Sequence, residues 1–238
     1  MPEPTAPGTT GSTESAQPQV TTGPAGGTPI VASSPQPSLP SATPGSAGPL
    51  PLVGTDQGFT GGAGGTDSVA YGLVLTNPNL DLAAHRMPVM VDFFDQAGDF
   101  LAGDEVFVTL LPTQTTAIAG NVFGAGAAVR MELGVPDDPT AFVAPATAGR
   151  FEITGSTYFD DGLVITTGEL TSRFGSDQPS VGVTVIYRDS AGAIVGGANG
   201  GIELVEAGER AAFDIVDGTS YPEITSTELY WQLSGALE

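Results

Sequence analysis

The feature that most constrains the fold is an internal repeat in which two segments align without a gap. The segment VMVDFFDQAGDFLAGDEVFVTLLPTQTTA, from Val89, matches VTVIYRDSAGAIVGGANGGIELVEAGERAA, from Val183, at a constant offset of 94 residues. The matching residues include Val91/Val185, Asp95/Asp189, Ala97/Ala191, Gly98/Gly192, Gly103/Gly197 and Leu110/Leu204, with Phe93 and Tyr187 matching as aromatics. Because such a repeat marks a structural unit that occurs twice, the chain is predicted to contain two copies of a unit of about 85 residues.

Two further blocks extend the repeat on either side of this segment. Upstream, GLVLTN from Gly72 resembles GELTSR from Gly168. Downstream, alternating apolar residues are expected to correspond, namely Val129, Met131 and Leu133 with Leu229, Trp231 and Leu233. We therefore predict a first repeat over residues 52–135, a linker over 136–150 and a second repeat over 151–238.

The pattern inside each copy is that of β-strands. Val89, Val91 and Phe93 alternate with more polar neighbours, and the same period of two returns from Val183. The sequences DQAG and DSAG that follow supply turn chemistry, since Asp bonds to nearby backbone and Gly accepts positive φ. With 34 Gly and 20 Pro, long helices are not expected. The predicted fold is all-β, with two tandem Ig-like or fibronectin-III-like antiparallel sandwiches. Further core candidates are Phe151, Ile153, Phe213, Tyr230 and Trp231.

Residues 1–51 have a different composition from the rest of the chain. This stretch holds more than half of the 20 prolines, among Gly, Ser, Thr and Ala, and no aromatic residue precedes Phe59. Such a segment cannot bury enough apolar surface to offset the entropy of ordering. It is predicted to be a disordered stalk, either an unspecific linker or a spacer across a cell envelope.

Composition excludes several classes of function. There is no Cys, so disulfides and thiolate sites are absent, and His85 is the single His. The net charge of −21 opposes binding of nucleic acid. No apolar run is long enough for a membrane span. The negative charge is expected either to serve solubility or adaptation to high salt, or to attract a basic partner.

The repeated motifs resemble those of a known family, the FxLYD domain. The hairpin VxVxxxDxxG, the pairs at Phe94-Asp95 and Tyr187-Arg-Asp, and the turn VEAGE from Val205 carry the resemblance. LTNPN from Leu75 is similar to a strand of the related water-stress, or late-embryogenesis-abundant, sandwich. In the first copy the sequence PTQT from Pro112 departs from the usual turn. The resemblance implies a small sandwich in exported proteins and no catalytic residues.

Acidic residues near the first hairpin are the candidate metal ligands. Asp95, Asp99 and Asp104 lie close in sequence, but an EF-hand loop needs Gly at position six, whereas Gly98 is at position four. The second copy keeps the hairpin with Ala193 and Ala198 in place of two of these acids. We predict solvated turn acids, with a looser Ca²⁺ site as the alternative. No other metal, cofactor or catalytic residue is predicted.

These observations predict a non-catalytic module outside the cytoplasm, secreted or anchored as a lipoprotein, whose export signal is missing from this chain. It would be a monomer that contacts an unknown protein or envelope polymer, or that acts as a spacer. The alternative is a ligand-binding module for a metal or a carbohydrate, in a substrate-binding or sensor role.

Overall fold

The computed structural model describes residues 30–32, 48–61, 67–146, 148–221 and 223–234. The described residues form antiparallel β-sheets and one 3-10 turn, η2 (Pro139–Ala141), which confirms the all-β prediction. No helix among them is long and apolar enough to cross a membrane.

Four sheets build two sandwiches that share one strand order. In the first sandwich, one sheet is β2 (Val53–Gly61), β3 (Ser68–Thr76) and β6 (Thr115–Phe123), and the other is β5 (Phe100–Leu110), β4 (Ala83–Phe94) and β7 (Arg130–Gly134). In the second, the corresponding sheets are β9 (Phe151–Asp160), β10 (Leu163–Ser172) and β13 (Arg210–Asp217), and β12 (Ile194–Val205), β11 (Gln178–Arg188) and β14 (Ser226–Leu233). The two halves of the chain therefore repeat one topology.

The gap-free part of the repeat is reproduced in three dimensions. Val91 pairs with Asp104 in β4–β5, and Val185 pairs with Ala198 in β11–β12, which preserves the offset of 94. Both hairpins also carry a bulge at the same place, after Phe93 and after Tyr187. The repeated sequence thus fixes register as well as strand position.

The upstream alignment of the repeat is wrong by one residue. A Cβ on Gly72 would point away from its own core, 2.9 Å from Ile186 Cδ1 of the other sandwich, whereas one on Gly168 would meet the ring of Phe213 in its own core. Since side chains alternate between faces, a slip of one residue exchanges inside for outside. The alignment that matches core-facing residues of one copy with core-facing residues of the other pairs Leu73 with Gly168.

The downstream alignment is wrong by four residues. Leu133 pairs with Val91, and the residue that pairs with the equivalent Val185 is Leu229, not Leu233. A shift of four keeps the period of two, so apolar alternation alone could not reveal it.

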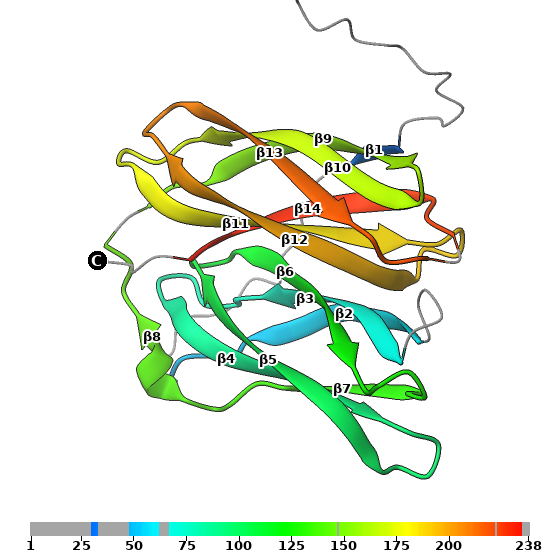
Figure 1. Cartoon of the computed structure of the whole chain (residues 1–238). Coiled ribbons are helices and arrows are strands. Elements are labelled where there is room, and N and C mark those ends of the chain that lie inside the picture. The colour runs from blue at the N-terminus through cyan, green and yellow to red at the C-terminus, as the bar shows by residue number, and fades with distance from the viewer. Residues whose placement is uncertain (1–29, 33–47, 62–66, 147, 222, 235–238) are drawn as a thin grey trace, which may run out of the picture.

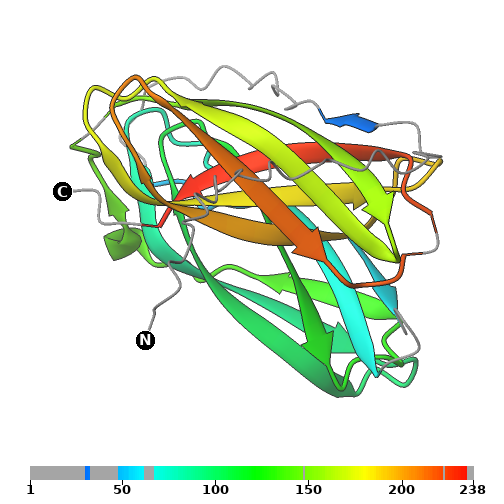
Figure 2. The ribbon, with the colours of Figure 1, turned by 45° about the horizontal axis from the view of Figure 1, so that its top comes forward.

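Most of the predicted tail, residues 1–51, lies outside the described residues. Two described stretches differ from the prediction. Ile30–Ala32 forms β1, which pairs with β9 at the border of its sheet (Figure 2). Leu50 exchanges two hydrogen bonds of 2.8 Å with the Asn79 side chain, so the chain is tied to the first sandwich just before β2.

The predicted linker, residues 136–150, is packed on the first sandwich where it is described. Its strand β8 (Phe142–Val143) pairs with the start of β4. Phe142 packs against the first core, and Val143 packs against the second. This segment therefore connects the two sandwiches through side-chain packing as well as through the backbone.

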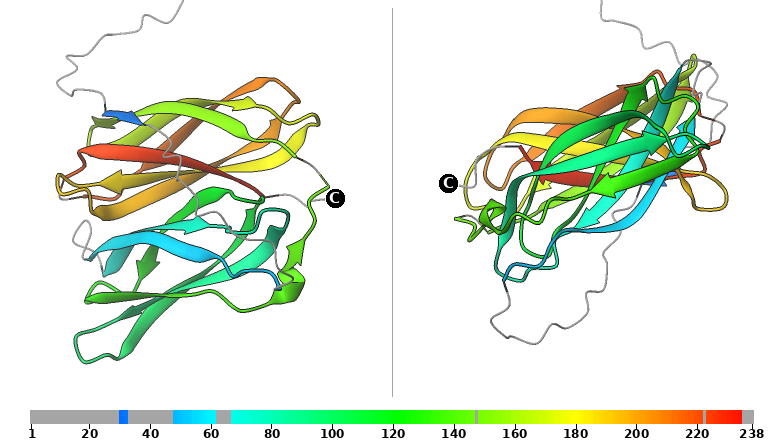
Figure 3. Two further views of the ribbon diagram at one scale, coloured as in Figure 1. Left: turned by 180° about the vertical axis from the view of Figure 1, so that it is seen from behind. Right: turned by 90° about the horizontal axis from the view of Figure 1, so that it is seen from below.

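The four sheets are stacked in one block (Figures 1 and 3). Sheet β12-β11-β14 of the second sandwich lies on sheet β2-β3-β6 of the first. Each sandwich has its own apolar core, and a third buried cluster fills the contact between them: Val74, Ala117, Ala119, Ile186, Ile194 and Tyr230. Strand β3 is buried at every position because both of its faces are covered.

The predicted core residues are assigned to these clusters by strand alternation. Phe151 and Phe213 are buried in the second core, and Ile153 and Trp231 pack against it. Tyr230, the neighbour of Trp231, points the other way and belongs to the cluster between the sandwiches.

Substituting a glycine at the sandwich contact should loosen the block. A Cβ at Gly58 would clash with the carbonyl oxygen of Ile194, so Gly58→Val should destabilise the protein by about 1–3 kcal/mol through overpacking. For a protein of this size that corresponds to a lower melting temperature by roughly 2–12 °C. Small-angle scattering should also show a larger radius of gyration.

The matched control is Gly201→Val, where the nearest atom to a new Cβ is Val181 O at 3.8 Å. It should leave both measurements close to those of the unmodified chain. Equal effects of the two substitutions would contradict a close approach at Gly58.

Candidate functional site

The contact between the sandwiches carries directed hydrogen bonds to strand edges. The carbonyl oxygen of Trp231, on edge strand β14, accepts from Gln114 Nε2 at 2.8 Å and from Thr116 Oγ1 at 2.9 Å. The carbonyl oxygen of Val195, the extra residue of the β12 bulge, accepts from Thr60 Oγ1 at 2.7 Å. These bonds satisfy polar groups that the sheet ladders leave open, and they fix the two sandwiches relative to each other.

The cationic side chain of Arg188 spans the contact between the sandwiches and is largely buried there. Its side chain is 14 % exposed and donates to Asp56 Oδ2 of the first sandwich at 2.7 Å and to Glu228 Oε2 of its own at 3.0 Å. Tyr230 Oη also donates to Glu228, at 2.9 Å. Burial lowers the pKa of Arg188, but the hydrogen bonds to the two carboxylates outweigh it, and the pKa is raised overall.

Beside this contact lies the candidate site, a cleft of about 510 Å³ where three sheets meet. Strands β5 and β6 form one wall, and strands β11, β12 and β14 form the other. Apolar side chains such as Val106, Ile118 and Ile202 line part of it. Glycines on both walls leave the backbone accessible, at Gly120, Gly182, Gly200 and Gly201.

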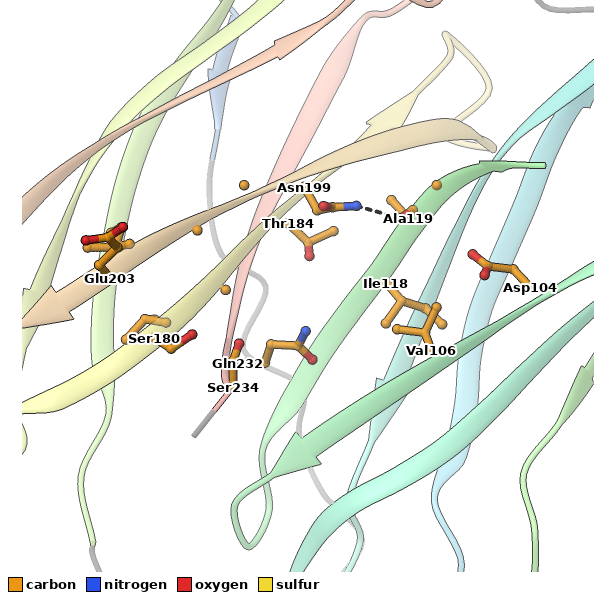
Figure 4. Close-up of a pocket in the computed structure, with 16 residues that line it drawn as sticks. Asp104, Val106, Ile118, Ala119, Ser180, Thr184, Asn199, Glu203, Gln232 and Ser234 are labelled. Carbon is orange, nitrogen blue, oxygen red and sulfur yellow. Dashed lines mark hydrogen bonds between the residues drawn. The ribbon is translucent and has the colours of Figure 1, made fainter. Parts of the chain in front are cut away.

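The polar lining of the cleft is rich in hydrogen-bond acceptors. Asp104 and Glu203 supply carboxylates, and Figure 4 places them at opposite ends of the lining. The Oε1 atom of Gln232 is buried without a hydrogen-bond partner. Asn199 uses its amide group to donate to Ala119 O at 2.9 Å. No Arg or His is among the residues that line the cleft.

One residue of the lining has an unusual backbone conformation. Ser180 lies within β11 at φ 59°, in the left-handed region that non-glycine residues rarely adopt. Its carbonyl oxygen accepts from Ser234 N at 2.8 Å, which ties β11 to the end of β14. Such strain, of order 1–3 kcal/mol, concentrates at functional sites.

The structure separates the three candidate calcium ligands. Asp95 Oδ1 accepts from the backbone N–H groups of Ala97 and Asp99, and Asp189 repeats this turn with Ala191 and Ala193. Gly98 and Gly192 provide the positive φ of the two turns, at 88° and 82°. The candidate Asp104 lies in the cleft instead, where it accepts from Tyr71 Oη at 2.7 Å.

Metal-ligating groups do not gather elsewhere in the described ranges. Within them, no three acidic or histidine side chains lie close enough together to hold a metal ion. His85, the single His of the chain, belongs to β4, and it is not among the cleft residues.

Sequence reasoning missed the cleft because its walls come from distant parts of the chain. The one available signal was the gain of glycine along β12, where Gly200 and Gly201 replace Val106 and Phe107 of the first copy. A Cβ on Gly200 would meet Ile215 in the second core, so it is Gly201, on the opposite face of the strand, whose missing side chain opens space that a second surface can turn into a cleft.

No protein-family model matches the chain, and no curated protein matches it.

Four tyrosines have raised pKa values, so the stability of the fold depends on pH in the alkaline range. Burial first, and then neighbouring carboxylates, raise the pKa of Tyr71, Tyr221 and Tyr230 above the ordinary value of about 10. Tyr187, packed on Tyr221 with ring centroids 5.0 Å apart, has its pKa raised mainly by burial. Tyr221 Oη donates to the buried Asp217 at 2.7 Å, which holds this tyrosine in its protonated form.

Stability should therefore fall above pH 10. Above that pH the unfolded tyrosines lose protons that the folded ones keep, so the unfolding free energy should drop by about 1.4 kcal/mol per pH unit for each tyrosine. Urea unfolding between pH 8 and 11 measures this slope, and Tyr221→Phe should make it shallower. A constant free energy across this range would contradict the prediction.

Calcium should have little specific effect on stability. Asp95 Oδ1 already accepts two backbone hydrogen bonds within its own turn, Asp104 lies apart from it in the cleft, and among the described residues no three acidic side chains come together around one cation. Melting in millimolar CaCl₂ against EDTA should show a small shift that NaCl reproduces at equal ionic strength. If a specific site existed and Ca²⁺ were present at 100 times its Kd, binding would instead raise the free energy of unfolding by about 2.7 kcal/mol. That corresponds to a melting temperature roughly 5–10 °C higher. A rise of that size that disappears in Asp99→Ala would overturn the prediction.

Proposed function

We propose that this chain is a non-catalytic module that presents fixed surfaces for protein contact outside the cytoplasm. The observation that carries the proposal is a difference between equivalent faces of the two sandwiches. The outward face of sheet β12-β11-β14 is covered by the first sandwich. The equivalent face of the first sandwich, on sheet β5-β4-β7, is open in the described structure.

This open face carries large apolar side chains that are exposed. Met90, Phe100 and Phe107 are 40 %, 59 % and 52 % exposed, respectively. By the offset of 94, Phe100 is the counterpart of Ile194, which is buried in the cluster between the sandwiches. A row of exposed large apolar side chains on one face is typical of an interaction surface.

The charges of the open face favour a basic partner. Asp92 and Glu105 lie beside Met90 on this face, Glu105 directly opposite it across β4 and β5, whereas Glu132, opposite Asp92 across β4 and β7, already forms an ion pair with Arg130. The guanidinium of Arg130 lies 4.3 Å from the ring centroid of Phe94, so this aromatic face already accepts a cation. The net charge of −21 would add attraction at long range.

The test uses an array of peptides in which Arg alternates with aromatic residues, with matched peptides that carry Glu in place of Arg. The chain should bind the Arg peptides selectively, and Phe100→Ser with Phe107→Ser should weaken binding by roughly tenfold or more, because exposed aromatics dominate such contacts. The matched control is Phe123→Ser, since Phe123 is 77 % exposed but lies on β6.

If the variant with both Phe100→Ser and Phe107→Ser loses binding to the Arg peptides while the Phe123→Ser control keeps it, the result supports protein interaction through this face. No binding to the Arg peptides, or equal binding by the double variant and the control, would contradict it. The role of a rigid spacer, which the stacked block also supports, would then be preferred.

The cleft favours a second candidate function, ligand binding. Its volume, the unpartnered Gln232 Oε1 and the strained Ser180 are features of a small-molecule site. The lining contains no aromatic side chain on which a sugar ring could stack. These features support a ligand recognised through hydrogen bonds and charge.

The family and the location belong to the same proposal. Membership of the FxLYD family is supported by the hairpin and turn motifs and agrees with the sandwich fold. An exported or surface-anchored setting is supported by the Pro- and Ser/Thr-rich composition of residues 1–51.

A further inference from the structure

The cleft between the sandwiches contains a buried acceptor that no group of the described structure satisfies. Gln232 Oε1 is buried without a partner, and leaving a buried acceptor unpaired is costly. The carboxylates of Asp104 and Glu203 add acceptors, while the lining contributes no Arg and no His. A ligand that fits this inventory brings several N–H donors and positive charge.

The positions of these acceptors favour an elongated ligand. Asp104 and Glu203 lie at opposite ends of the lining, and Gln232 projects between them (Figure 4). Apolar side chains between the ends, such as Ile118 and Val106, suit methylene groups. A chain of methylenes with amino groups at both ends matches this order of polar and apolar contacts.

We infer that the cleft binds a linear aliphatic polyamine. The terminal ammonium groups would bind Asp104 and Glu203, and an inner amino group would donate to Gln232 Oε1. Asp104 can do so while it accepts from Tyr71, because that hydrogen bond uses only Oδ2. This inference rests on the second candidate function, ligand binding, and is independent of the open face of β5-β4-β7.

The test is calorimetric titration of the full chain with spermine, spermidine and putrescine at physiological salt. One molecule of spermine should bind per chain, and putrescine, which is shorter and has fewer amino groups, should bind more weakly. Asp104→Asn and Glu203→Gln should each weaken spermine binding roughly tenfold or more, as expected for lost hydrogen bonds to a charged group. Gln232→Leu should also weaken it.

The control separates a site from the general attraction of an acidic protein. Asp99→Asn and Glu209→Gln, each tested alone, remove the same charge as the single cleft variants but outside the cleft, and should leave spermine binding unchanged. Equal losses in the control and the cleft variants, or many spermine molecules per chain, would show screening only and overturn the inference.

A titration with maltotriose distinguishes this inference from the function on which it rests. Maltotriose binding that the cleft variants weaken, with no specific spermine binding, would keep ligand binding but overturn the polyamine. If neither compound binds, both the inference and the second candidate function fail.

Discussion

The close approach of two sheets at Gly58 and Gly72 is the contact on which the rest of the molecule depends. At both positions a side chain would collide with the second sandwich, with the carbonyl group of Ile194 at the first and with Ile186 and Ile194 at the second. Without side chains there, the sheets come near enough for Ile186 and Ile194 to be fully buried, which stabilises by about 1.5–3 kcal/mol for each side chain. The same proximity lets Thr60, Gln114 and Thr116 reach backbone carbonyls of the other sandwich.

This contact joins unlike faces of one repeated unit. The second sandwich offers the outward face of β12-β11-β14, and the first offers the outward face of β2-β3-β6. Such a head-to-tail arrangement leaves one face of each kind open at the ends of the stack. At the open end of the first sandwich, Asp92 occupies the place of Ile186, and a charge there opposes a repeat of the same apolar contact. The chain therefore forms a stack of two units that is not continued by the same packing.

The buried polar groups follow from the same geometry. Arg188 is held between Asp56 and Glu228 because one carboxylate comes from each sandwich, so its ion pairs depend on the docking. The cleft likewise exists only because β12 and β14 of one sandwich face β5 and β6 of the other. The unpaired Gln232 Oε1 shows that the docking leaves a polar group available in this cleft.

The local structure of each half, and its repetition along the chain, could be predicted from the amino-acid sequence. Period-two alternation placed β4 and β11, the DQAG and DSAG turns placed the hairpins, and the offset of 94 gave their register, because these features depend on residues close together in the chain. The outer blocks were misaligned by one and by four residues, since alternation carries no information on loop length. Three features follow only from the docking of the two sandwiches. Gly72 faces the other sandwich, and Tyr230 and its neighbour Trp231 pack in different apolar clusters. Asp104 lines a cleft together with Glu203 and Gln232. The physical reason is that docking depends on the shape of two surfaces formed from distant segments, and neither surface exists until its own sandwich has folded.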